Sequence, residues 1–245
     1  MWGAGSTCLV GATWQSGCMC ADDSSSMEDR APEREPRERN PRGQGERLRD
    51  EVLAALVRLV GDEERMRPLP LSLREVAREA GVTAPALYRH FADKEELGRA
   101  AEQDGFARLV AAMDAADEAA AGGAPSERLI AVAQAYCRFA LENLGYFRIM
   151  FKAGMAGFDE MRTVPSSAEQ LAERWRAAVV RLREQGIELS QSPEQAAMFV
   201  WSSVHGRLTL SSAVEAVWPL GDVFVYVEKL VDSLVKTGLP RLSAM

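Results

Sequence analysis

Hydrophobic residues recur every three or four positions along most of the chain after residue 43. Near the start of this pattern, Leu48, Val52, Leu56 and Leu59 are separated by charged and polar residues. This spacing is the period of an amphipathic helix, and no segment alternates with the period of two that marks a strand. The pattern therefore predicts an all-α fold.

Polar caps and helix breakers divide the rest of the pattern into further helices. The predicted ranges are 44–61, 72–80, 83–91, 94–121, 126–143, 146–152, 167–185, 192–214 and 223–236. The predicted caps are Ser72, Thr83, Asp93, Ser126 and Ser192. Gly81 follows the second helix as a stop signal, and the two prolines in 66–70 place that segment in a loop.

The first 42 residues differ in composition from the rest. Residues 1–26 are rich in Gly, Ser, Thr and Cys, and residues 28–42 interleave Arg with Glu, Asp and Pro. Such a segment buries too little apolar surface to fold, so we expect a disordered leader over 1–42. The break at Met27 suggests an alternative start of translation. The alternative to an unstructured leader is a metal or redox site at Cys8, Cys18 and Cys20.

Composition and charge narrow the class of protein. A net charge of −7 over 245 residues argues against a surface that binds nucleic acid everywhere, but it permits a local basic site. No apolar run reaches the roughly 18 residues of a membrane span, and the four cysteines lack disulfide-scaffold spacing, so a cytoplasmic protein without membrane contact is expected. The sequence shows no phosphate loop, nucleophile elbow or metal spacing. We therefore expect no enzymatic activity, no catalytic or metal residues and no cofactor.

Residues 72–91, SLREVAREAGVTAPALYRHF, join two short capped helices at a glycine. The small Ala77 allows the helices to cross closely, and Gly81 takes the turn, which is the spacing of a helix-turn-helix. The second helix can then enter the major groove of DNA by its N-terminal end. The alternative is a helical hairpin that serves only as a scaffold in a protein-interaction module.

The longer string GVTAPALYRHFADKEEL resembles the signature of the tetracycline-repressor (TetR) family of bacterial regulators. The matching parts are Gly81-Val82-Thr83, Leu87-Tyr88-Arg89-His90-Phe91 and Lys94-Glu95-Glu96-Leu97. The resemblance spans about 47–97. It departs from the family in residues 65–70, where the family has a compact turn with glycine and an aromatic residue.

The resemblance implies a three-helix DNA-binding domain over 43–104 and a helical effector-binding and dimerisation domain over 105–245. The residues expected at DNA are Thr83, Ala84, Pro85, Tyr88, Arg89, His90 and Lys94. Among these, Ala84 and Pro85 match positions that face base edges. For Tyr88 the alternative is a ring half-buried against the hairpin, and for His90 it is a solvated surface histidine.

A second resemblance lies at Trp201-Ser202-Ser203-Val204-His205-Gly206, which is similar to the mark of the WHG subclass of this family; the aromatic segment 146–151 also matches it. Trp201 and His205 share one helix face. They predict either a polar handle in an effector pocket or, as the favoured alternative, a core histidine bonded to a backbone carbonyl, with Gly206 allowing close helix packing. The residues expected to line the pocket, or else to form a core, are Tyr136, Phe139, Phe147, Met150, Phe151, Trp175, Met198, Trp201 and His205.

The last two predicted helices carry apolar stripes that suit a four-helix dimer bundle. The residues assigned to that interface are Val200, Val204, Leu208, Val227 and Leu230. A two-fold dimer selects a near-palindromic double-stranded DNA operator. The sequence thus predicts a homodimeric repressor that an apolar small-molecule effector releases from DNA. Residues 28–104 contain fifteen basic and eighteen acidic residues, and this lack of positive charge supports the scaffold-only alternative.

Overall fold

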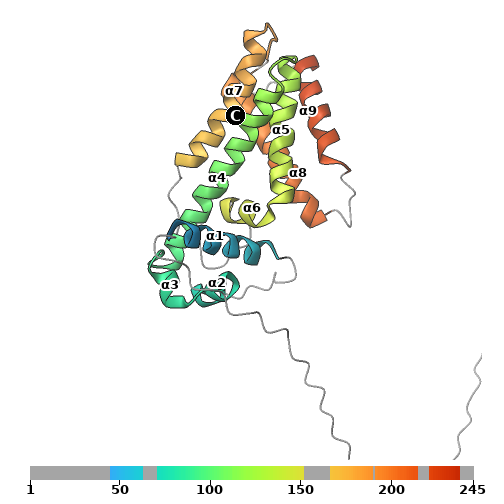
Figure 1. Ribbon diagram of the computed structural model, residues 1–245. Helices are drawn as coiled ribbons and strands as arrows, with labels where there is room; N and C mark the ends of the chain where they lie inside the picture. Colours follow the sequence, from blue (N-terminus) through green and yellow to red (C-terminus); the bar gives the residue numbers. More distant parts are fainter. Residues whose placement is uncertain (1–44, 63–70, 152–165, 190, 215–220, 238–245) are drawn as a thin grey trace, which may run out of the picture. The chain divides into compact units, whose positions relative to one another are not determined.

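The computed structural model describes residues 45–62, 71–151, 166–189, 191–214 and 221–237. Every regular element in these ranges is a helix, which confirms the all-α prediction (Figure 1). The predicted leader over 1–42, its three cysteines and the loop over 66–70 lie outside the described residues.

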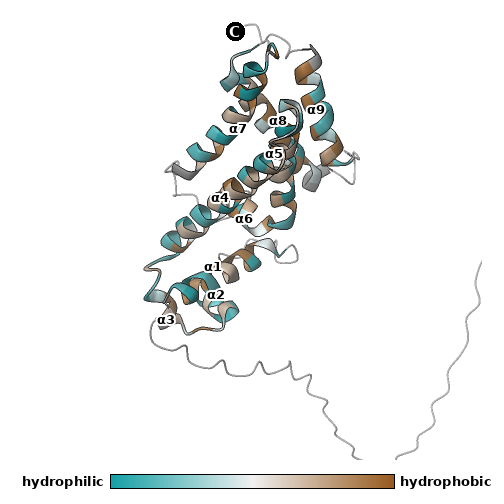
Figure 2. Ribbon diagram, turned by 45° about the horizontal axis from the view of Figure 1, so that its top comes forward, coloured by the Kyte–Doolittle hydropathy of each residue, from teal (hydrophilic) through white to brown (hydrophobic). Residues whose placement is uncertain are grey.

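The described ranges contain nine helices. In chain order they are α1 (Gly45–Gly61), α2 (Leu73–Ala80), α3 (Ala84–Tyr88), α4 (Lys94–Ala119), α5 (Pro125–Glu142), α6 (Leu144–Phe151), α7 (Ser166–Glu184), α8 (Pro193–Val214) and α9 (Val223–Thr237). Apart from α3, these bounds agree with the sequence prediction to within two residues. Hydrophilic and hydrophobic segments alternate along helices such as α7 and α9 (Figure 2), as the periodicity requires.

The capping residues explain why the helices begin where they do. The Ser72 side chain accepts a hydrogen bond from the backbone N–H of Glu75, whose carboxylate accepts one in return from the Ser72 N–H at 2.9 Å. Gly81 ends α2 in the left-handed region at φ 69°, a conformation that glycine adopts without steric cost. Asp93 caps α4 through the Glu96 N–H at 2.6 Å. These three predictions are confirmed.

Two local predictions were wrong. The second helix of the motif spans only Ala84–Tyr88 instead of 83–91; Thr83 is its N-cap residue as predicted, but its side chain makes no capping bond. In α5 the N-cap residue is Ala124 rather than Ser126, because Pro125 takes the first helical position, where its fixed φ is favourable. The Glu127 carboxylate then accepts the free Ala124 N–H at 2.9 Å.

The buried side chains form two hydrophobic cores. The first joins α1, α2, α3 and the start of α4, and the second joins the rest of α4 with α5 to α9. Helix α4 contributes Leu97 and Ala101 to the first core and Leu109 and Met113 to the second. Figure 1 shows α1 to α3 gathered at one end of α4. The predicted domain boundary at residues 104 and 105 therefore falls inside a continuous helix.

Helix α6 is a second connection between the two cores. Its Ile149 is buried in the first core, whereas Phe147 and Met150 belong to the second. Arg148 donates a hydrogen bond to the Val60 carbonyl at the end of α1, at 2.9 Å. At Gly145 the backbones approach so closely that an added Cβ would lie 2.0 Å from the Val57 carbonyl oxygen. Only glycine permits this crossing of α6 over α1.

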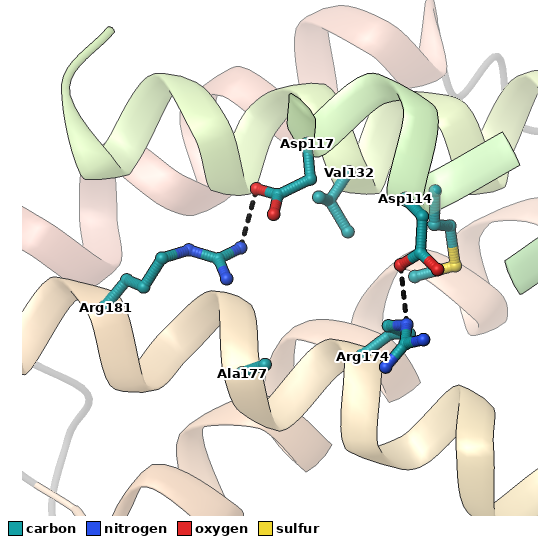
Figure 3. Close-up of a pocket in the computed structure, with 7 residues that line it drawn as sticks. Asp114, Asp117, Val132, Arg174, Ala177 and Arg181 are labelled. Atoms are coloured by element: carbon teal, nitrogen blue, oxygen red, sulfur yellow. Dashed lines mark hydrogen bonds and ion pairs between the residues drawn. The ribbon is translucent and has the colours of Figure 1, made fainter. Parts of the chain in front are cut away.

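An ionic seam holds α4 against α5 and α7. Asp117 accepts two hydrogen bonds from Arg128, at 2.8 and 3.0 Å, and a third from Arg181 at 2.6 Å. Asp114 forms an ion pair with Arg174 at 2.5 Å. Figure 3 shows Arg174 and Arg181 reaching from α7 toward Asp114 and Asp117 of α4. These four residues line a small hollow, whose volume is about 20 Å³. The hollow has room for about one water molecule.

Candidate functional site

Helix α3 presents a polar face on a buried apolar base. Leu87 and Phe91 are fully buried and fix the helix to the first core. Thr83, Pro85, Tyr88 and Arg89 are exposed, and Ala84, His90 and Lys94 are partly exposed. Tyr88 is 51% exposed, so about half of the residue is buried, as the alternative to a DNA contact expected. The predicted DNA-binding residues thus lie together at the surface around α3 and the start of α4.

The charges left unpaired on this surface differ from what a count of its charged residues suggests. Most carboxylates in 71–99 are engaged within the protein: those of Glu75, Asp93 and Glu96 serve as helix caps, and that of Glu79 pairs with Arg58 at 3.0 Å. Within the described ranges, no ion pair is found for the exposed guanidinium groups of Arg74, Arg78 and Arg89. These cations therefore face solvent without a protein counter-charge.

His90 and Lys94 lie at the edge of this surface. An added Cβ on Gly45, the first residue of α1, would lie 3.4 Å from the His90 ring. The histidine therefore lies beside the start of α1, partly exposed. Lys94 is the first residue of α4, directly after the capping Asp93. Backbone N–H groups at a helix start also favour anions, so this place suits a phosphate contact.

In the second core a tyrosine joins the two residues of the predicted aromatic motif. The Tyr136 hydroxyl lies 2.8 Å from His205 Nδ1 and accepts a hydrogen bond from the Trp201 indole N–H at 3.3 Å. Burial lowers the pKa of His205, so the ring is neutral at pH 7. The histidine is thus bonded to a side chain, and the predicted bond to a backbone carbonyl is wrong.

Aromatic rings surround this hydrogen-bonded group. The His205 ring centre lies 4.5 Å from that of Phe151 and 5.3 Å from that of Phe147. Trp175 packs edge-on against Tyr136, with the ring centres 5.5 Å apart. These rings pack against one another as part of the core, which is the alternative that the sequence left open. Gly206 does not serve close packing, because an added Cβ would meet no described atom within 4 Å.

The remaining predicted pocket residues lie elsewhere. Phe139 contacts Tyr146, with ring centres 6.4 Å apart, and Met150 packs against Gly105 of α4. Met198 is 56% exposed and lies with Trp175 and Trp201 on a hollow of about 280 Å³ between α7 and α8. The nine predicted residues therefore do not line one cavity: some form the ring cluster, and three border this hollow.

The hollow also contains charged residues that the sequence analysis did not single out. Glu169, Glu173 and Arg176 come from α7, and Glu194 comes from the start of α8. Arg176 donates two hydrogen bonds to Glu173, at 2.6 and 2.8 Å. Each helix alone shows only a solvated charged face, so no signal in the sequence brings these residues together.

Four of the five residues assigned to the dimer interface require a correction; the fifth, Leu230, is only partly buried. Val200, Val204, Leu208 and Val227 are buried in the core of a single chain, where they are not available to a partner. A hydrophobic stripe predicts a buried face but not which chain buries it. Among the side chains described on these two helices, the large apolar ones that are exposed are Met198, Leu210 and Val225.

Two further expectations concern metals and membranes. Among the described residues, no three His, Cys, Asp or Glu side chains come together to hold a metal ion. In the same part of the chain, no helix combines the length and the apolar character needed to cross a bilayer.

Burial raises the pKa of the Cys137 thiol to about 12, so this cysteine is a protonated core residue.

Two family models match the chain. Residues 69–101 match the family described as bacterial regulatory proteins, tetR family, and residues 129–234 match the tetracyclin repressor-like C-terminal domain. Together these ranges cover more than half of the 245 residues. A segment of 28 residues is 68% identical to an uncharacterized HTH-type transcriptional regulator of Haemophilus influenzae; it covers 11% of this chain and 14% of that protein.

Solved structures share the fold. One is the TetR family transcriptional regulator PfmR of Thermus thermophilus, with 24% identity, a TM-score of 0.53, and coverage of 78% of this chain and 99% of that one. Another is the transcriptional regulator FadR of Bacillus subtilis in complex with stearoyl-CoA, with 12% identity, a TM-score of 0.61, and coverage of 76% and 97%.

Proposed function

The chain belongs to the TetR family of DNA-binding transcriptional regulators, and on that premise we propose that it is a repressor that a small molecule releases from its operator. The observation that carries this proposal is the exposed polar face of α3 on a fully buried base of Leu87 and Phe91. A helix that served only as a scaffold would not need exposed Tyr88 and Arg89 beside uncompensated arginines.

The proposed contacts divide into two classes. The first class supplies charge or hydrogen bonds to phosphates and grooves. Its members are Lys94, Arg89, Tyr88, Thr83 and His90. Ala84 and Pro85 at the start of α3 face base edges, where small side chains favour contact with thymine methyl groups. The first class supports affinity for any DNA, and the second supports sequence preference.

The proposed assembly is a homodimer that reads a near-palindromic operator. Its support is the exposed apolar pair Leu210 and Val225, on the two helices at the carboxyl end of the described chain. Effector release requires coupling between the two cores, for which α4 and α6 are the physical connections. We further propose that the protein acts in the cytoplasm and catalyses no reaction.

Two substitutions test the DNA-binding surface. Lys94→Ala is expected to weaken binding to all duplexes alike and to reduce the slope of log affinity against log salt by about 1, because one phosphate contact is lost. Ala84→Ser is expected to leave that slope unchanged and to alter the preferred sequence in a selection from random duplexes. Lys229→Ala, on α9, is the control and should behave as the wild type.

These binding measurements decide between the two functions considered. If Lys94→Ala binds DNA as tightly as the wild type at every salt concentration, the N-terminus of α4 does not lie at a phosphate. If neither the wild type nor Lys94→Ala binds DNA, the motif is a scaffold and the repressor proposal fails.

A further inference from the structure

The hollow between α7 and α8 has an apolar aromatic floor. Trp175 is almost fully buried and Trp201 partly so, while Met198 is 56% exposed at its edge. The small side chains of Ala172 and Ala197 leave the space between the helices open. At about 280 Å³ the volume is at the low end for small-molecule sites, so a compact organic ligand fits it better than a long chain.

The rim of the hollow is negatively charged. The lining contains three carboxylates, those of Glu169, Glu173 and Glu194, and one guanidinium, that of Arg176. Hydrogen bonds from Arg176 lower the pKa of Glu173, and hydrogen bonds from its own backbone N–H and from Ser192 lower the pKa of Glu194. Both carboxylates are therefore ionised at neutral pH. Because Arg176 is already paired with Glu173, the lining keeps an excess of negative charge.

We propose that this hollow binds a small organic cation, whose apolar body contacts Trp201 and Met198 and whose positive charge lies among the carboxylates. Indole rings attract cations through their electron-rich faces, and ionised carboxylates add to that attraction. The carboxylates would repel an anionic ligand, and a neutral ligand would gain nothing from their charge. The role of the cation as effector rests on the proposed function, whereas its binding does not.

The test uses three ligands of the same shape and different charge. Benzyltrimethylammonium, its neutral carbon analogue neopentylbenzene and the anion phenylmethanesulfonate are titrated into the full chain by calorimetry. The cation is expected to bind at least about tenfold more tightly than the other two. Equal or weaker binding of the cation would overturn the proposal.

Matched variants locate the binding. Glu194→Gln and Met198→Ala are each expected to weaken cation binding about fivefold, through the lost charge and the lost apolar contact respectively. The controls are Glu184→Gln, an exposed carboxylate of α7, and Leu141→Ala, an exposed apolar residue of α5; neither lines the hollow, and both should bind normally. Cation binding that is unchanged in Glu194→Gln and in Met198→Ala would contradict the proposed site.

The same cation added to a protein–DNA complex separates this inference from the proposed function. Release of DNA by the wild type but not by Glu194→Gln supports the hollow as the effector site. Cation binding without release supports the hollow as a cation site and overturns its role as effector site. Absence of DNA binding before any cation is added counts against the proposed function alone.

Discussion

At the scale of single residues, local signals predicted most of the caps, though not that of α5, and left the buried polar contacts open. Ser72 and Gly81 act within a few positions of each other, so the sequence alone was enough to place them. Tyr136 and His205 are 69 positions apart, and no local pattern indicates that they meet at 2.8 Å. The surroundings of His205 therefore needed the structure.

The burial of His205 predicts a pH dependence of stability. Burial lowers the pKa of His205 in the folded chain, so the unfolded chain binds this proton more readily. The stability due to the neutral ring is present above the unfolded pKa of about 6.5 and is lost as the pH falls from there toward the folded value. Urea unfolding should show the wild type less stable at pH 5.5 than at pH 7.5.

Two variants assign this effect. His205→Gln removes the titrating group and should reduce the difference in unfolding free energy between the two pH values. His90→Gln replaces the only other histidine of the chain and should keep the difference. An unchanged pH dependence in His205→Gln would mean that other groups cause it.

At the scale of elements, periodicity predicted the helices but not how they pack. The stripe that includes Val204 marks a buried face of α8, and the structure shows that the chain's own core buries it. The predicted helix over 94–121 already spans the boundary between the two predicted domains, but nothing in the sequence indicated that α6 crosses α1. That crossing depends on backbone contact at Gly145, which a sequence pattern does not reveal.

Two glycines in different helices test the crossing of α6 over α1. Gly145→Ala is expected to destabilise the protein by about 1–3 kcal/mol, because the added Cβ overlaps the Val57 carbonyl. Gly206→Ala, which meets open space in α8, should instead stabilise it by about 0.5–1 kcal/mol through helix propensity. Denaturant unfolding of both variants measures the effects. Equal effects of the same sign would show that α6 does not pack closely on α1.

At the scale of the whole molecule, two cores are joined by α4 and α6. The family and the fold class followed from the motif at 72–97 and from the helical period. The charged hollow between α7 and α8 could not be predicted from the sequence. Its charged residues come from two helices, and on each helix alone they form an ordinary exposed charged face. A single sequence indicates which residues are polar but not which of them face the same space.

The proposed dimer predicts that exposed apolar residues hold two chains together. Leu210→Glu and Val225→Glu are each expected to give folded monomers in sedimentation, because both side chains are about half exposed in the single chain. The control is Leu141→Glu on α5, 55% exposed, which should remain dimeric. Dimers in both test variants would place the interface elsewhere.

The central claim is that this chain recognises a particular DNA sequence through the surface around α3. The most direct measurement is the binding of the full chain, over a salt titration, to a duplex from the region upstream of its own gene and to a shuffled duplex of the same composition. We predict affinity for the upstream duplex at least about a thousandfold higher than for the shuffled one at physiological salt, with both weakening as salt increases. Equal affinity for the two duplexes at every salt concentration would contradict the claim.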